Sequence, residues 1–232
     1  MARQVRSELT RRKILDAAVD VFGEVGYGVA GWTNIVERTG MTKGALYHHF
    51  EAKEPLAAAI IEEGSDALLG ALHDACGADS PALENMIHGT FAVAHLLGTD
   101  KVTGTAEQLA AALAGFNDAA ARFYGSLIAS MVAEARRAIA EGDLRDDLDP
   151  EAVGESVVGT MLGTHLIFIG TTGHRQERTS ADDAAARSSK MWEFLLPGIV
   201  SESSQAYFEQ FLRREKLRHT RAEAAHSEYA ST

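Results

Sequence analysis

The sequence predicts an all-α fold in which a small N-terminal three-helix domain precedes a larger helical domain. Apolar residues recur at the spacing of one helical face in nearly every segment, and no run of residues alternates with the period of a β-strand. Glycine is scattered along the chain, but Gly26, Gly40 and Gly142 each follow the last residue of a periodic segment. The chain has 232 residues, which allows one large domain or a small domain fused to a larger one, and its 46% hydrophobic content is enough for a substantial core.

The first 75 residues divide into four predicted helices. Residues 8–25 form one amphipathic helix that Gly26 ends, and its apolar face consists of Ile14, Ala17, Ala18, Val21, Phe22 and Val25. Two short helices follow at 32–39 and 43–50, with Gly40 between them and Thr42 as an N-cap. A long helix covers residues 53–75 and has Pro55 in its first turn.

Six further helices are predicted in the rest of the chain. They cover residues 81–97, 105–114, 117–141, 150–169, 183–196 and 203–221. Asp149-Pro150 supplies an N-cap and a proline at the first helical position, so this helix start is strongly marked. The polar residues 170–182 are expected to form a loop, and the last ten residues, 223–232, a flexible tail.

Charge is distributed unevenly along the chain. The net charge is −11, yet the first 54 residues contain eight Arg or Lys against seven Asp or Glu, and the remainder 14 against 26. A basic N-terminal arm on an acidic protein favours contact of that end alone with phosphate, although a solvated terminus would have the same composition. The single cysteine and the lack of a signal peptide indicate the cytoplasm.

Several classes of function find no support in the sequence. The longest apolar stretch, 157–170, is shorter than a bilayer span, so we expect a buried helix and no membrane partner. No catalytic motif is present, and we expect no enzymatic activity and no cofactor. His48 and His49 are adjacent on a helix and point about 100° apart, so they cannot chelate a metal together.

Residues 26–50 have the layout of a helix-turn-helix, with two short helices joined by a tight turn. We expect Trp32, Ile35, Val36, Met41, Ala45 and Leu46 to pack inward. The second helix would then expose Thr42, Lys43, Gly44, Tyr47, His48 and His49 and could enter a DNA major groove. Lys43 lies at a helix N-terminus, where a cation opposes the macrodipole unless an anion is near. The alternatives are a solvated charge for Lys43 and a core role for Tyr47.

This region resembles the DNA-binding signature of the TetR family of repressors. The resemblance rests on Gly26-Tyr27, Asn34-Ile35, Gly40, Thr42-Lys43-Gly44, Leu46-Tyr47, Phe50, Lys53-Glu54 and Leu56-Ala57. It implies a DNA-binding domain over residues 1–53 and a ligand-binding and dimerisation domain over 54–222. With the basic arm included, the predicted DNA-binding residues are Arg6, Arg11, Arg12, Thr33, Thr42, Lys43, Gly44, Tyr47, His48 and Lys53.

The second domain is similar to that of the γ-butyrolactone receptors within this family. The matching residues are Tyr124, Gly142-Asp143-Leu144, Asp149-Pro150, Met191-Trp192 and Leu195-Leu196-Pro197. The resemblance implies a homodimeric repressor that binds a palindromic operator and is released by a γ-butyrolactone-like signal controlling antibiotic or secondary-metabolite genes. The chain departs from that pattern at Leu127, Ala106-Glu107 and His165, so an antibiotic or other xenobiotic inducer, or an orphan regulator without a ligand, are the alternatives.

Ligand-binding candidates lie on apolar helical stripes of the second domain. They are Phe91, Tyr124, Leu127, Met131, Met161 and His165. For any single one of these residues a role in the core alone is the more common case, and a histidine such as His165 in an apolar helix is more often a hydrogen-bonded core residue than a ligand contact. Helices 151–169 and 184–212 are expected to form a four-helix interface with their copies, helped by Gly154, Gly159 and Gly163.

Overall fold

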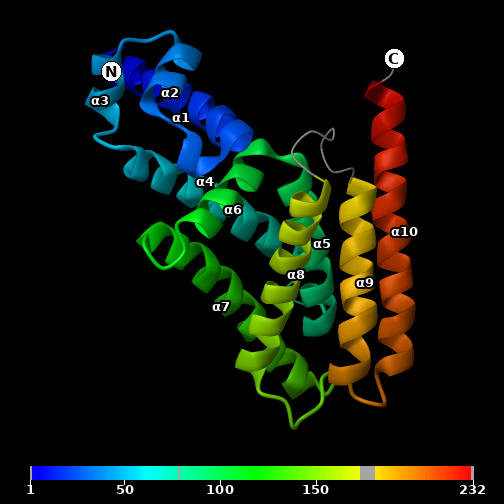
Figure 1. Cartoon of the computed structure of the whole chain (residues 1–232). Coiled ribbons are helices and arrows are strands. Elements are labelled where there is room, and N and C mark those ends of the chain that lie inside the picture. Colours follow the sequence, from blue (N-terminus) through cyan, green and yellow to red (C-terminus); the bar gives the residue numbers. More distant parts are fainter. Residues whose placement is uncertain (1, 78, 173–180, 231–232) are drawn as a thin grey trace. The chain divides into compact units, whose positions relative to one another are not determined.

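The computed structural model describes residues 2–77, 79–172 and 181–230, and side chains of residues 4–77, 79–172 and 183–219. Within these ranges the chain forms ten α-helices and no β-strand, with one isolated bridge between Leu144 and Val200 (Figure 1). The all-α prediction is therefore confirmed. The helices pack as two compact units, and the long helices α4 (Lys53–Ala75) and α7 (Asp118–Glu141) each contribute to both.

The first unit comprises residues up to Ala67 together with Asp100–Tyr124. It contains α1 (Ala2–Val29), α2 (Trp32–Thr39), α3 (Lys43–His49), α6 (Lys101–Ala112) and parts of α4 and α7. α1 packs on α2 and α6, and the core includes the fully buried side chains Ile14, Phe22, Ile35, Leu46 and Leu56. Val25, predicted on the apolar face of the first helix, is instead 43% exposed, and Gly26 directly after it has a non-helical φ of 75°.

The second unit comprises Leu68–Thr99 and residues from Gly125 onward. Its further helices are α5 (Ala82–Thr99), α8 (Pro150–Thr172), α9 (Ala181–Ile199) and α10 (Gln205–Ala230). α9 packs against α5, α8 and α10, and Figure 1 shows α9 and α10 running side by side. Trp192 of α9 is fully buried, and its Nε1–H donates a hydrogen bond of 2.7 Å to Thr90 Oγ1 of α5.

Most predicted helix boundaries agree with the structure to within a few residues. α9 continues through Pro197 to Ile199, because a proline in the last turn removes only one helical hydrogen bond. α10 extends to Ala230, past the end expected near residue 221. α8 runs to Thr172, and most of the loop predicted at 170–182 lies outside the described residues.

α8 is apolar along most of its length. By length and mean hydropathy alone its 23 residues would suffice to cross a membrane. In the structure its inner face instead packs in the helical unit, where it buries Val153, Val157, Val158 and Met161. The outward face carries Leu166 and Ile167, which are 51% and 66% exposed.

Gly154 brings α8 and α7 into close contact. A Cβ atom at this position would lie 2.5 Å from Val132 Cγ2 and 2.9 Å from the Val132 backbone nitrogen. Gly154 therefore faces α7 within the chain and not a second copy, which corrects the expectation that it serves the dimer interface.

We expect Gly154→Ala to lower the free energy of unfolding by about 1–3 kcal/mol, because the helices must separate to admit the methyl group. Chemical denaturation monitored by circular dichroism measures the change. The control is Gly125→Ala in α7, where nothing lies within 4 Å of the added Cβ. Equal stability of the two variants would contradict the close contact.

Candidate nucleic-acid interface and ligand cavity

The turn between α2 and α3 is fixed by local hydrogen bonds. Gly40 adopts φ 64°, a left-handed conformation that glycine reaches without steric cost, and its N–H donates to Val36 O at 3.0 Å. Thr42 caps α3, since its Oγ1 accepts a hydrogen bond of 3.3 Å from the N–H of Ala45. The two short helices and the glycine turn form the predicted helix-turn-helix.

The outer face of this motif carries the residues predicted to contact DNA. Leu46 and Ile35 are fully buried beneath it. Exposed side chains or glycine occupy the outer positions Thr33, Thr42, Lys43, Gly44, Tyr47 and His48, whereas His49 is half-buried. A face of small and polar residues on a slim helix suits entry into the major groove.

Lys43 and Tyr47 form one group on that face. The Tyr47 ring lies 5.4 Å from the Trp32 ring, centroid to centroid, and remains 41% exposed. Lys43 Nζ lies 5.8 Å from the centroid of the Tyr47 ring. The cation and the phenol therefore occupy adjacent positions, from which both could contact a phosphate.

Lys53 at the start of α4 is anchored within the first unit. Its Nζ donates hydrogen bonds to Tyr27 O at 2.7 Å and Ala30 O at 3.0 Å, and it lies 4.2 Å from the Tyr27 ring centroid. Two of its three N–H donors are occupied by these carbonyls. One N–H of Lys53 therefore remains for the predicted phosphate contact. The other two stabilise the α1–α2 junction.

The three arginines of the predicted arm have different surroundings. Arg6 is exposed. The guanidinium of Arg11 lies 5.4 Å from the ring centroid of Phe50, the residue that ends α3. Arg12 forms ion pairs with Asp16 at 2.7 Å and with Glu63 of α4, so its charge is already compensated.

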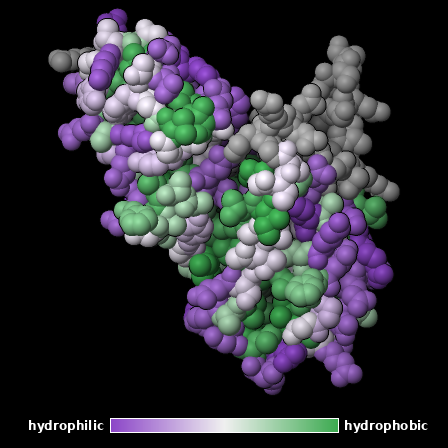
Figure 2. Space-filling view, viewed as in Figure 1, coloured by the Kyte–Doolittle hydropathy of each residue, from purple (hydrophilic) through white to green (hydrophobic). Residues whose placement is uncertain are grey.

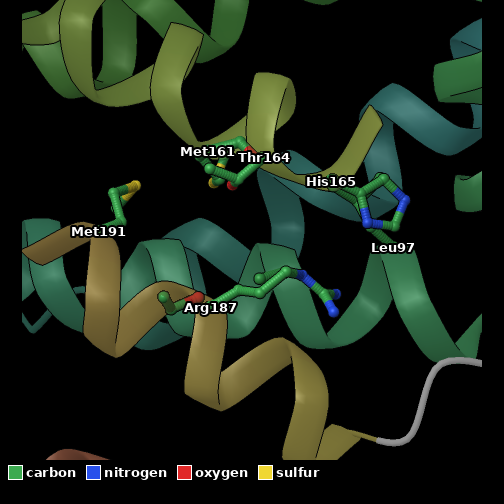
Figure 3. Close-up of a pocket in the computed structure, with 8 residues that line it drawn as sticks. Leu97, Met161, Thr164, His165, Arg187 and Met191 are labelled. Atoms are coloured by element: carbon green, nitrogen blue, oxygen red, sulfur yellow. The ribbon is translucent and has the colours of Figure 1, made fainter. Parts of the chain in front are cut away.

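Two of the predicted ligand-binding residues, Met161 and His165, line one small cavity in the second unit (Figure 3). The cavity lies between α5, α8 and α9 and has a volume of about 10 Å³, room for roughly one water molecule. Its lining consists of Ala94, Leu97, Met161, Thr164, His165, Arg187, Ser188 and Met191.

His165 is an unusual core histidine. Its side chain is 4% exposed, and neither ring nitrogen has a hydrogen-bond partner among the described residues. Burial, and then the charge of Arg187, lowers the pKa of His165 to about 4. The imidazole is therefore neutral at pH 7.

Arg187 was not anticipated from the sequence. It is half-buried on α9, its Nη1 has no hydrogen-bond partner among the described residues, and its guanidinium lies 4.1 Å from the Phe168 ring centroid. Burial lowers the pKa of Arg187, and the carboxylate of Asp183 acts in the opposite direction. The sequence could have indicated this position, because Arg187 shares one helical face with Ala184, Ser188 and Met191.

The remaining ligand candidates do not line this cavity. Phe91 of α5 stacks on His219 of α10 with ring centroids 5.1 Å apart. Leu127 and Met131 of α7 are buried. Tyr124 is half-buried in the first unit, where burial and the charge of Glu107 raise its pKa.

The helix-turn-helix with its exposed outer face has the geometry of a DNA-binding protein, and the comparisons identify the family. A model of the bacterial regulatory proteins of the tetR family matches residues 14–60, and a tetracyclin repressor-like C-terminal domain matches residues 80–201. The chain therefore belongs to the TetR family of transcriptional repressors.

Its relatives include receptors of bacterial signals. The A-factor receptor protein of Streptomyces griseus is 26% identical over 200 residues, which are 86% of this chain and 67% of that protein. A crystal structure of a γ-butyrolactone receptor, an ArpA-like protein, superimposes with a TM-score of 0.73 at 27% identity and covers 92% of this chain and 99% of that one. CprB from Streptomyces coelicolor in complex with its operator has a TM-score of 0.70 at 28% identity and covers 95% and 99%.

Proposed function

We propose that this protein represses transcription as a homodimer on a palindromic operator and is released by a small molecule of the γ-butyrolactone class. The observation that carries the proposal is the outer face of α3, where Thr42, Lys43, Gly44, Tyr47 and His48 are all exposed above the buried Leu46. The names of the similar receptors support the ligand class. A further similar structure, described as the molecular basis for control of antibiotic production by a bacterial hormone, supports antibiotic or secondary-metabolite genes as the targets. The protein acts in the cytoplasm, where its operator lies.

A dimer is needed because one helix-turn-helix reads only a short half-site, whereas two copies read half-sites one DNA turn apart. α8 and α9 supply an apolar face for this contact. Leu166, Ile167 and Phe194 are 51%, 66% and 82% exposed in the single chain. Gly159 and Gly163 leave open space beside them, and Figure 2 shows apolar surface over α8. This exposed face is typical of an isologous interface.

We expect Ile167→Glu combined with Phe194→Glu to produce a monomer, because two carboxylates would be buried against their copies. Sedimentation velocity gives the oligomeric state. The control is Phe116→Glu, which introduces one such carboxylate in the first unit at a side chain that is 88% exposed. A double variant that still dimerises would place the interface elsewhere.

The repressor function is tested by footprinting the full-length protein on the DNA upstream of its own gene. We expect protection of a palindrome, with affinity that falls as salt rises. Addition of γ-butyrolactones or butenolides should then release the DNA. Protection without symmetry, or no protection at any promoter tested, would contradict the proposal.

A further inference from the structure

We propose that the outer face of α10 is a second phosphate-binding surface, which contacts double-stranded DNA in addition to the helix-turn-helix. This α10 face consists of Arg213, Arg214, Lys216, Leu217 and Arg218, all of which are exposed. The inference rests on the proposed function, because it adds a DNA contact from the second unit to the contact made by α3. It gives the second unit a role besides the proposed dimerisation and ligand binding.

Positive charge on the second unit is concentrated in this part of α10. The unit contains 12 Arg or Lys against 20 Asp or Glu, and five of its basic residues fall within positions 213–221. The one acid in that segment, Glu215, is 4% exposed and accepts hydrogen bonds from His88 of α5 at 2.8 Å and from His219 at 2.9 Å. Because this carboxylate is turned inward, the exposed charges from residue 213 to residue 218 are all positive.

The arginines of the α10 face differ in their pairing from other exposed arginines of the unit. Arg136 of α7 and Arg145 after it each form an ion pair with a carboxylate of the same unit. Neither Arg213 nor Arg214 forms an ion pair with a described residue, and Arg218 Nη1 lies 3.9 Å from the buried Glu215. These guanidinium groups are therefore available to an anion from outside the chain.

The composition of the α10 face fits phosphate better than a protein partner. The centre of a protein–protein interface is depleted in charged residues, whereas protein–DNA interfaces are polar and strongly positive. Guanidinium groups bind phosphate oxygens through paired hydrogen bonds. From Arg213 to Arg218 the helix rises by about 7.5 Å, a length over which duplex DNA presents about four phosphates. The face therefore matches the DNA backbone in sign and density of charge.

DNA binding at several salt concentrations tests the proposal. The full-length protein is titrated into two duplexes of equal length, one from upstream of its own gene and one of random sequence. We expect Arg213→Gln combined with Arg214→Gln to weaken binding to both duplexes at least about ten-fold, because phosphate contacts do not depend on sequence. The slope of log affinity against log salt should fall by about two to four units, since a homodimer loses up to about four such contacts.

The matched control is Arg136→Gln combined with Lys190→Gln, which removes two exposed positive charges from α7 and α9 of the same unit. It has the same net charge as the Arg213 and Arg214 double variant and should keep wild-type affinity and slope. Equal losses in the two double variants would reflect net charge alone and overturn the proposal. Wild-type affinity and slope in the Arg213 and Arg214 double variant would overturn it as well.

A cross-link locates the contact in a protein that keeps all of its arginines. A photoactivatable aryl azide is attached to Leu217→Cys, within the α10 face, or to Ser203→Cys, an exposed position before α10 begins. We expect DNA to be cross-linked from position 217 and not from position 203. Cys76 is present in both proteins and gives the common background. A yield from position 217 no higher than that from position 203 overturns the proposal.

The outcomes also separate this surface from the proposed function and from a protein partner. Loss of affinity for the random duplex, with no protection of the upstream DNA by the wild type, would support the α10 face and contradict the operator. Protection of a palindrome with an unchanged salt slope in the Arg213 and Arg214 double variant would do the opposite. Assemblies larger than a dimer that form without DNA and are absent in this variant would assign the face to an acidic surface of another copy, and would overturn the DNA contact.

Discussion

Replacement of both Lys43 and Tyr47 with alanine is expected to weaken operator binding by about 100-fold for each half-site, because each protomer loses two phosphate contacts of about 1.5 kcal/mol each. The slope of log affinity against log salt should also fall by about two units, since the homodimer loses one phosphate-neutralising cation from each of its two protomers. Mobility-shift titrations at several salt concentrations measure both quantities. The fold should persist, since both side chains are exposed.

The control for this variant is Lys190→Ala, which removes one positive charge from an exposed position on α9 in the second unit. It should leave affinity and salt slope at their wild-type values. If the Lys43 and Tyr47 double variant bound the operator with wild-type affinity and slope, the outer face of α3 would not be the DNA-contacting surface.

The second large effect concerns Glu107, an acid buried in α6. Its side chain is 2% exposed and its Oε2 has no hydrogen-bond partner among the described residues. Burial raises the pKa of Glu107 to about 7 from an unfolded value near 4.5. Between these two pKa values the folded state holds a proton that the unfolded state releases. The contribution of Glu107 to the free energy of unfolding is therefore fully present below pH 4.5 and is lost as pH rises through 7.

Glu107→Gln should remove this pH dependence. We subtract the free energy of unfolding of the wild type from that of the variant at each pH. This difference is expected to be up to about 3 kcal/mol larger at pH 8 than at pH 4, since each pKa unit corresponds to about 1.4 kcal/mol. Denaturant titrations of both proteins at the two pH values provide the comparison. A difference that does not change with pH would show that the carboxyl is already ionised at little cost.

Glu215 of α10 provides the opposite case in the same chain. Burial alone would raise its pKa, but hydrogen bonds with His219 at 2.9 Å and His88 at 2.8 Å reverse the effect and lower the pKa to about 2. The contribution of the ionised Glu215 to the free energy of unfolding is therefore present above pH 4.5 and is lost as pH falls toward 2. Glu215→Gln should destabilise the protein at pH 7, and a gain in stability there would contradict the paired arrangement.

The local features of the fold could be predicted because short-range signals determine them. Gly40 and Thr42 mark the turn and the cap of the helix-turn-helix, and the 3.6-residue period located Ile35 and Leu46 in the core. The order of all ten helices follows from such signals. The assignment of residues 1–53 and 54–222 to separate functions stays a prediction.

Features that depend on a distant partner could not be predicted. Gly154 looks like any small residue until Val132 is placed against it. Arg187 belongs to a polar stretch of sequence, and only the packing of α9 on α5 and α8 brings it into a cavity with His165. Likewise, the sequence shows Glu107 next to Ala106 in a predicted helix but does not show that the carboxyl group is buried. Hydrophobic periodicity and capping residues predict each helix separately. The contact at Gly154, the position of Arg187 and the burial of Glu107 depend on how helices pack against one another.

The anchoring of Lys53 has a mechanical consequence. This residue begins α4, a single helix of 23 residues whose first part belongs to the first unit and whose last part belongs to the second. Such a helix is about 34 Å long and behaves as a stiff rod. Because Lys53 Nζ is bonded to the carbonyls of Tyr27 and Ala30, a tilt of the rod pulls directly on the segment that leads into α2. A rotation of about 5° would displace one end of a rod of that length by about 3 Å relative to the other, which is about the length of one hydrogen bond.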